Sequence, residues 1–217
     1  MMGEFFKRLF GRRENQVDPR KEIDALEADL NRAPSENDLA TLVPIILPHD
    51  CLTTDWPGPI AAIGSLPFAI AWALIPEPNY FLYLTHERAA LWEDSGIDWR
   101  AEAMRNLAQV SEGRHRWAGD KLDDDGKPFI LALLFDDGFG PSRLLLPHLY
   151  DDLLGPDYRV AIPERTCAVA YRRELTPAQA RDVDGIVEGC FRHGTEPMSN
   201  ERFNPEDFWT EVSLKPA

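Results

Sequence analysis

The longest nearly apolar stretch of the chain is residues 59–76. It is about as long as a membrane-spanning helix, but Pro67 divides it, and β-branched and aromatic residues fill its second half. A proline inside a helix removes a backbone hydrogen bond and clashes with the preceding turn. The stretch therefore indicates buried strands of a sheet rather than a membrane span.

Two pairs of apolar runs, each interrupted by a short turn, predict two β-hairpins. The first pair is residues 68–74 with 80–84, and the second is residues 158–162 with 167–171. A further strand is expected over residues 129–135, which are all apolar and therefore typical of the centre of a sheet.

Capping residues mark where helices begin between these strands. Thr85 and Asp98 each precede a helical segment. Thr176, followed by Pro177, starts a last helix, because proline is well tolerated at the first helical position.

The order of these elements predicts an α+β fold: a mixed or antiparallel sheet built from two hairpins and a central strand, with helices packed on it. We expect one domain over residues 17–217. Residues 18–43 read as a helical front, and residues 44–59, rich in proline, threonine and aspartate, as a loop. Residues 65–193 read as the sheet core, and residues 195–217 as a tail that docks through the aromatic side chains of Phe203, Phe208 and Trp209.

The composition fits a folded chain with a packed core, and it argues against one class of partner. Hydrophobic residues make up 44% of the 217 residues, which is ordinary for a globular protein. Asp and Glu number 37 against 23 Lys and Arg, so the net charge is −14. Binding to a phosphate backbone needs clustered basic residues, so no nucleic-acid partner is expected.

The three cysteines, Cys51, Cys167 and Cys190, are widely spaced and form no C-x-x-C pair. Such spacing is typical of reduced thiols, and the last two are expected to act as small core hydrophobes. The N-terminus shows no secretory signal, because Lys7 and Arg8 interrupt its apolar residues. We therefore expect a cytoplasmic protein.

Residues 1–16 differ in charge from the rest of the chain. They carry a net charge of +2, and four apolar side chains recur on one face of a helix: Phe5, Phe6, Leu9 and Phe10. A basic amphipathic arm of this kind can bind weakly to a membrane surface or to a partner. The alternative is a short helix that packs on its own domain or frays, because a helix of about ten residues is marginal alone.

The chain lacks the standard motifs for nucleotides, metals and serine hydrolases. It contains no G-x-x-x-x-G-K-[ST], no G-x-G-x-x-G, no H-E-x-x-H and no G-x-S-x-G. Residues 123–126 fail as a calcium loop, because Lys121 and Ala132 occupy two positions that need acidic ligands. No cofactor and no metal site are predicted, and residues 123–126 are expected to form a turn.

Four polar residues are candidates for a site that only the fold would assemble: Asn106, Ser142, His148 and Arg165. Ser142 follows a glycine-rich loop that leads into an apolar helix, expected to run through residue 153 with a kink at Pro147. His148 and Asp152 are four residues apart and would share a face of that helix as a proton shuttle. The alternative, which we favour, is that these polar residues are structural.

An excess of acidic residues lies between residues 118 and 157, which hold nine acidic and three basic side chains. The candidate acidic surface consists of Asp123, Asp124, Asp125, Asp136, Asp137, Asp151 and Asp152. A concentrated negative field would speed encounter with a basic protein partner. The alternative is that acidic turns only keep the protein soluble.

Five short segments, taken in their order and spacing, resemble the YtpQ family of bacterial proteins, whose function is unknown. They are residues 67–72, 80–85, 99–107, 140–146 and 160–165. The resemblance covers roughly residues 65–210, and it departs at Thr166, where the family tends to have Asp after the arginine. It implies a bacterial, cytoplasmic α+β domain, and it supplies no activity, cofactor or catalytic residue.

Two functions of different class follow. The first, favoured by the missing catalytic motifs and the acidic charge, is a non-catalytic binding protein that engages a protein partner. The second is a hydrolase-type enzyme whose site contains Ser142, His148, Asn106 and Arg165. The two differ in whether a histidine and a carboxylate lie within hydrogen-bond distance of Ser142.

Overall fold

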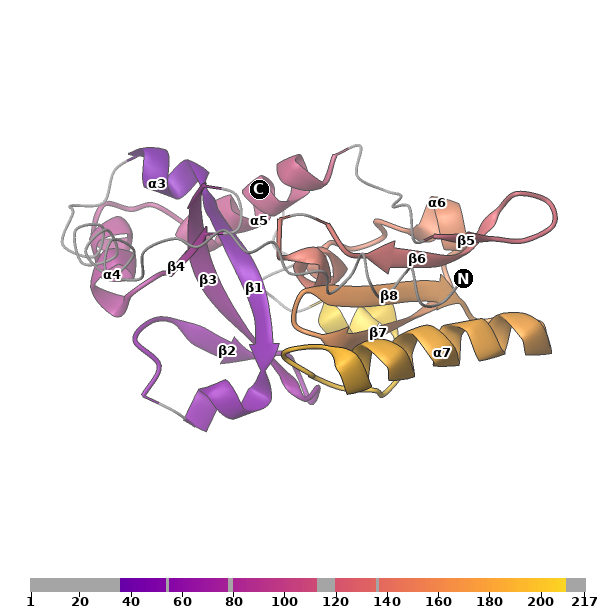
Figure 1. The fold of residues 1–217 in the computed structure, drawn as a ribbon. Helices are drawn as coiled ribbons and strands as arrows, with labels where there is room; N and C mark the ends of the chain where they lie inside the picture. Colours follow the sequence, from indigo (N-terminus) through magenta and orange to yellow (C-terminus); the bar gives the residue numbers. More distant parts are fainter. Residues whose placement is uncertain (1–35, 54, 78–79, 113–119, 136, 210–217) are drawn as a thin grey trace. The chain divides into compact units, whose positions relative to one another are not determined.

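The computed structural model describes residues 36–53, 55–77, 80–112, 120–135 and 137–209, which belong to one unit of the chain, residues 36–217. These residues form helices and two four-stranded antiparallel sheets (Figure 1). The first sheet contains β1 Leu42–Pro48, β2 Ile60–Ala62, β3 Phe68–Glu77 and β4 Tyr80–Tyr83. The second contains β5 Lys121–Leu122, β6 Pro128–Leu133, β7 Tyr158–Glu164 and β8 Cys167–Arg172. The α+β class predicted from the sequence is confirmed.

In the first sheet, β3 is the central strand. It pairs with β1 along one side and with β2 and then β4 along the other, all antiparallel. The predicted β3–β4 hairpin is present, but β1 lies where the sequence predicted the end of a helical front and a loop. Pro44 is tolerated in β1 because β1 pairs with β3 alone, and an edge strand can point a missing N–H outward.

In the second sheet, the strand order is β5, β6, β8, β7. The predicted β7–β8 hairpin is present, and the fully buried β6 is an interior strand, as its apolar sequence predicted. The two predicted hairpins therefore belong to separate sheets. The two-residue strand β5 was not predicted from the sequence.

The helices begin at the predicted caps. Thr85 accepts a hydrogen bond at the start of α4 His86–Asp94, Asp98 does so for α5 Trp99–Ser111, and Thr176 forms a capping box at the start of α7 Pro177–His193. The remaining helical segments are short: α3 Glu36–Ala40, α6 Asp151–Leu154 and the 3₁₀ helices η1 His49–Thr53, η2 Gly140–Leu145 and η3 Pro205–Phe208. The apolar helix expected through residue 153 is thus two separate pieces, η2 and α6, because Pro147 and the turn after it interrupt the helix.

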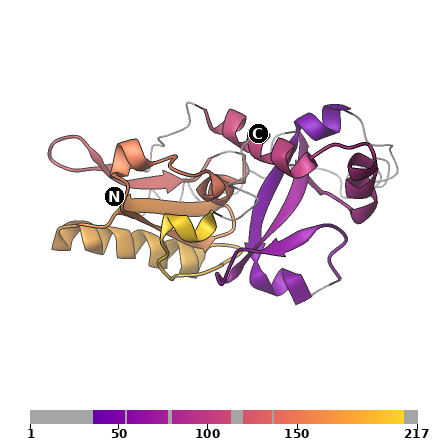
Figure 2. The same cartoon turned by 180° about the vertical axis from the view of Figure 1, so that it is seen from behind.

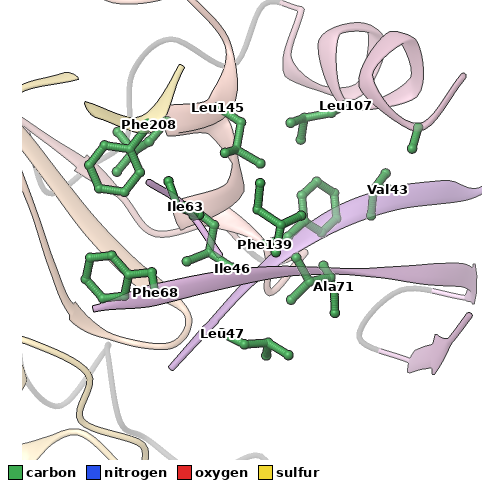
Figure 3. Packing of buried hydrophobic residues seen from close by; sticks show 14 of the residues in the cluster. Val43, Ile46, Leu47, Ile63, Phe68, Ala71, Leu107, Phe139, Leu145 and Phe208 are labelled. Carbon is green, nitrogen blue, oxygen red and sulfur yellow. The ribbon is translucent and has the colours of Figure 1, made fainter. Parts of the chain in front are cut away.

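One hydrophobic core contains residues of both sheets. Figure 3 shows the part of this core around β1 and β3 of the first sheet. Helix α5 packs against β1, and α7 lies along β7 and β8 (Figure 2). The C-terminal segment adds two of the predicted aromatic anchors, since Phe203 and Phe208 both pack against Phe68 of β3. Phe203 also forms a backbone bridge with Val160 of β7. This segment therefore links the second sheet to the first.

Two expectations concern parts of the chain outside the described residues. These are the basic arm, residues 1–16, and the first part of the helical front, residues 18–35. Within the described ranges, none of the helices has the length and apolar character that crossing a membrane requires.

Candidate functional site

Asn106 has a structural role. It is buried on α5, and its side-chain amide donates to the carbonyl oxygens of Leu39, at 2.8 Å, and Leu42, at 2.9 Å. These carbonyls belong to α3 and the first residue of β1. The side chain therefore ties α5 to the beginning of the first sheet, as expected for a structural polar residue.

Ser142 is buried in η2, where its hydroxyl oxygen has no hydrogen-bond partner among the described residues. Its neighbour Arg143 is also completely buried. The Arg143 guanidinium forms two hydrogen bonds with Asp137, at 2.6 and 3.2 Å, and lies 4.2 Å from the ring centre of Phe135 and 4.9 Å from that of Phe139. Arg143, and not Ser142, therefore makes the stabilising polar contacts of this region. The sequence analysis did not single out Arg143.

His148 is not on a helix face with Asp152, as the sequence suggested. It lies in the turn before α6 with a φ of 62°, and its Nδ1 is 2.9 Å from Asp151 Oδ2. Its ring also contacts Trp209, with 4.6 Å between the ring centres. The turn after Pro147 breaks the helix that would have brought His148 and Asp152 together.

Arg165 lies in the turn between β7 and β8, where its Nε donates to the carboxylate of Glu196. Among the described residues, no hydrogen bond, ion pair or ring contact joins Asn106, Ser142, His148 or Arg165 to another of the four. In the part of the chain that the structure describes, Ser142 has neither a histidine nor a carboxylate at hydrogen-bond distance. This geometry gives the hydrolase alternative no support.

Asn106 and Ser142 make a matched pair for a stability test. Replacing Asn106 with alanine leaves two buried carbonyls without their donor, so we expect a loss of about 1–3 kcal/mol in the free energy of unfolding. Ser142→Ala removes a hydroxyl that has no partner, so it is expected to leave this free energy unchanged or higher. Urea unfolding of both variants measures the difference. Equal losses in the two variants would contradict the structural assignment of Asn106.

Three members of the predicted acidic surface pair with side chains of the same chain. Asp123 accepts hydrogen bonds from the backbone N–H of Lys127, at 2.8 Å, and from Arg172, also at 2.8 Å, and these bonds lower the pKa of its carboxyl. Asp137 pairs with the buried Arg143. Residues 123–126 form the predicted turn, between β5 and β6. Asp151 pairs with His148, whereas Asp124, Asp125 and Asp152 are exposed; Asp136 lies outside the described residues.

A pocket of about 590 Å³ lies beside the first sheet, away from all of these candidates. Its lining comes from three regions: Trp56 and residues 58–61, before and within β2; Trp72 of β3; and residues of α4 and the first turn of α5. The side chains that define its chemistry are Trp56, Ile60, Trp72, His86, Glu93 and Arg100. We call it the Trp56–Trp72 pocket.

Close backbone packing sets the position of the pocket wall. The backbone N–H of His86, at the start of α4, donates to Pro57 at 3.2 Å. Gly58 lies so close to Leu84 that a Cβ on it would be 1.6 Å from the Leu84 carbonyl oxygen. The segment before β2 is therefore held against the junction of β4 and α4, which places Trp56 and Ile60 opposite α4.

Trp72 lines the pocket together with the ion pair between Glu93 and Arg100, and all three side chains contact the buried Trp99. Trp72 meets Trp99 edge to face, with 5.1 Å between ring centres, and the Arg100 guanidinium lies 3.9 Å from the Trp99 ring centre. Glu93 Oε1 accepts from Arg100, at 2.9 Å, and from the Trp99 indole, at 3.0 Å. These two bonds lower the pKa of Glu93, so it is a carboxylate at neutral pH.

The two indoles that line the pocket also carry buried polar atoms. In the part of the chain that the structure describes, Trp56 Nε1 and Trp72 Nε1 have no hydrogen-bond partner. Sequence reasoning missed this pocket because its residues come from a predicted loop, a strand and two helices. No group of three or more histidine, cysteine, aspartate or glutamate side chains within the described ranges is placed to hold a metal ion.

Comparison of the chain with protein-family models, with curated proteins and with solved structures returns no match. The YtpQ resemblance therefore stays an expectation from the sequence.

Proposed function

We propose that this protein is a non-catalytic binding protein and that the Trp56–Trp72 pocket receives a segment of its partner. The observation that carries the proposal is the composition of this pocket: a 590 Å³ recess lined by two indoles, by aliphatic side chains and by the charged pair of Glu93 and Arg100. Aromatic side chains beside an accessible charge are typical of binding surfaces.

The chemistry of the lining favours binding over catalysis. Among the described residues that line the pocket there is no serine, threonine, cysteine, tyrosine or lysine, which are common side-chain nucleophiles. A general acid or base works best when its pKa lies near the operating pH. The pKa of Glu93 is instead lowered by Arg100 and Trp99, which keeps this carboxylate ionised.

The proposal is tested by comparing what the wild-type protein and pocket variants retain from a lysate of the source organism. Trp56→Ala removes an indole from the pocket wall, and recovery of the partner is expected to fall about tenfold. Leu91→Ala is the matched control, because Leu91 is an exposed apolar residue of α4 that does not line the pocket.

Thermal unfolding of each variant checks that the fold is retained, and mass spectrometry quantifies the recovered proteins. Recovery that depends on Trp56 and not on Leu91 supports the proposal. Equal recovery by the wild type and Trp56→Ala, with the fold intact, would show that the partner binds elsewhere.

A further inference from the structure

We infer that the partner segment is an extended, basic peptide that pairs with the free edge of β2 and places a lysine or arginine side chain in the Trp56–Trp72 pocket. This inference rests on the proposed function. It is carried by two observations on the same part of the molecule, the unpaired edge of β2 and the excess of carboxylates on and next to α4.

Within the described part of the chain, the outer edge of β2 has backbone groups without a strand partner. The Ile63 N–H donates to the Phe68 carbonyl at 3.1 Å, and the antiparallel register pairs Ala61 with Ile70. Hydrogen-bonded and non-hydrogen-bonded pairs alternate in such a ladder, so Ile60 and Ala62 point their N–H and C=O groups away from β3. Among the described strands, β2 pairs with β3 alone, and it lies at the edge of the first sheet in Figure 1.

This free edge borders the pocket. Ile60 and Ala61 of β2 belong to the pocket lining, together with the residues that lead into the strand. A strand added beside β2 would lie about 4.8 Å from it, and its alternate side chains would project to the pocket side of the sheet. Backbone pairing and occupation of the pocket are therefore compatible in one extended segment.

Charge favours a basic segment over an acidic or neutral one. Glu87, Glu93, Asp94 and Asp98 are exposed on α4 or directly after it, whereas Arg88 of the same helix is buried. The chain as a whole carries a net charge of −14. Both of the Glu93 bonds described above use Oε1. Among the described residues its second oxygen accepts no hydrogen bond, so it is available to an incoming cation.

The pocket lining suits the rest of a lysine or arginine side chain. The aliphatic stem of either residue packs well on apolar and aromatic surface while its charged head stays at a polar rim. Trp56, Pro59 and Ile60 supply that surface, and the face of an indole attracts a cation. Glu93 supplies the polar rim that would hold the charged head.

The test uses the full-length protein and the labelled peptide acetyl-Val-Arg-Val-Arg-Val-amide, with binding followed by fluorescence anisotropy. We expect this peptide to bind more tightly than its counterparts with glutamine or glutamate in place of arginine. Binding is expected to weaken as salt rises, because exposed charges are screened over about 8 Å at 0.15 M. Equal binding of the arginine and glutamine peptides would overturn the basic character of the partner.

Two substitutions test the electrostatics of the pocket itself: one removes a negative charge and the other removes a positive charge. Glu93→Gln is expected to weaken binding of the arginine peptide about two- to fivefold, the range of an exposed ion pair. Arg100→Gln removes the single Lys or Arg side chain among the described lining residues, so it is expected to strengthen binding by a similar factor. Glu174→Gln, an exposed glutamate between β8 and α7, is the control and should leave binding unchanged. The same response in all three variants would overturn the placement of the arginine beside Glu93.

Strand pairing is tested on the peptide, so that the fold of the protein is untouched. In an extended segment, the N–H groups of alternate residues point to opposite edges. One peptide carries N-methyl groups on its valines and another on its arginines. The peptide whose N-methyl groups lie on the edge that faces β2 is expected to bind about tenfold more weakly, because each methyl group removes a hydrogen bond and blocks close approach.

Equal retention or equal loss in the two N-methyl peptides would overturn pairing with β2. That result would leave the proposed function in place if recovery of the natural partner still depends on Trp56. If recovery does not depend on Trp56, the proposed function itself fails. The failures of the two proposals are therefore distinguishable.

Discussion

Replacing Arg143 with methionine is expected to lower the free energy of unfolding by about 3–5 kcal/mol. The side chain of Arg143 is completely buried and pairs with Asp137, whose own side chain is 15% exposed. Methionine fills much of the space of arginine, but it leaves the Asp137 carboxylate without this cation in a poorly hydrated position. Urea unfolding, with the slope compared between variants to check for a cooperative transition, measures the loss.

The double variant Arg143→Met with Asp137→Asn separates charge from packing. It removes both charges, so it is expected to be more stable than Arg143→Met alone. Arg143→Lys keeps the charge but cannot form two parallel bonds to one carboxylate, so its loss should be intermediate. A double variant as unstable as Arg143→Met would show that the effect comes from packing against Phe135 and Phe139 and not from the ion pair.

This ion pair matters because of its position in the fold. Arg143 belongs to η2, which packs against β1 and α5 of the first sheet region and against β6 and β8 of the second. Gly140, at the start of η2, is so close to β6 that a Cβ on it would be 1.9 Å from the Leu133 carbonyl oxygen. The short segment from Asp137 to Leu145 is thus a tightly packed connection between the two sheets.

Features set by neighbouring residues could be predicted from the sequence. The caps Thr85, Asp98 and Thr176 were correct because a cap is a local interaction between a side chain and the next turn. Both hairpins were correct because their strands are adjacent in sequence and joined by short turns. The aromatic anchors Phe203 and Phe208 were recognisable as large apolar residues in an otherwise polar tail.

Features set by distant residues could not be predicted. Strand β1 contains two prolines, a composition that reads as a loop unless it is known that β1 is an edge strand paired with β3. The division into two sheets depends on β6 pairing with β8 instead of with the first hairpin. Neither pairing leaves a local signal, and the two-residue β5 is too short to show a period.

The candidate site illustrates the same limit. Trp56, Trp72 and Arg100 are far apart in sequence, and each is ordinary in its own segment. Only the pairing of β2 with β3 and the close approach of Gly58 to Leu84 bring their side chains to one pocket. A search for motifs at fixed spacing cannot find a binding surface built in this way.

Replacing Gly58 with alanine is the sharpest test of how that surface is held in place. The added Cβ would lie 1.6 Å from the carbonyl oxygen and 2.8 Å from the carbonyl carbon of Leu84. Both are backbone atoms, so the strain cannot be relieved by rotating a side chain. We expect the segment before β2 to be displaced, the bond between His86 and Pro57 to break, and the free energy of unfolding to fall by at least about 3 kcal/mol.

Gly64→Ala is the matched control, six residues further along. Gly64 has a φ of +51° and open space around its Cα, so alanine there meets only the strain of the left-handed conformation, about 1–2 kcal/mol. The basic peptide should bind Gly64→Ala as it binds the wild type, whereas Gly58→Ala should lose binding, because Trp56 and Ile60 move with the displaced segment. Similar losses of stability in the two variants, with binding retained in both, would show that the contact between Gly58 and Leu84 does not position the pocket wall.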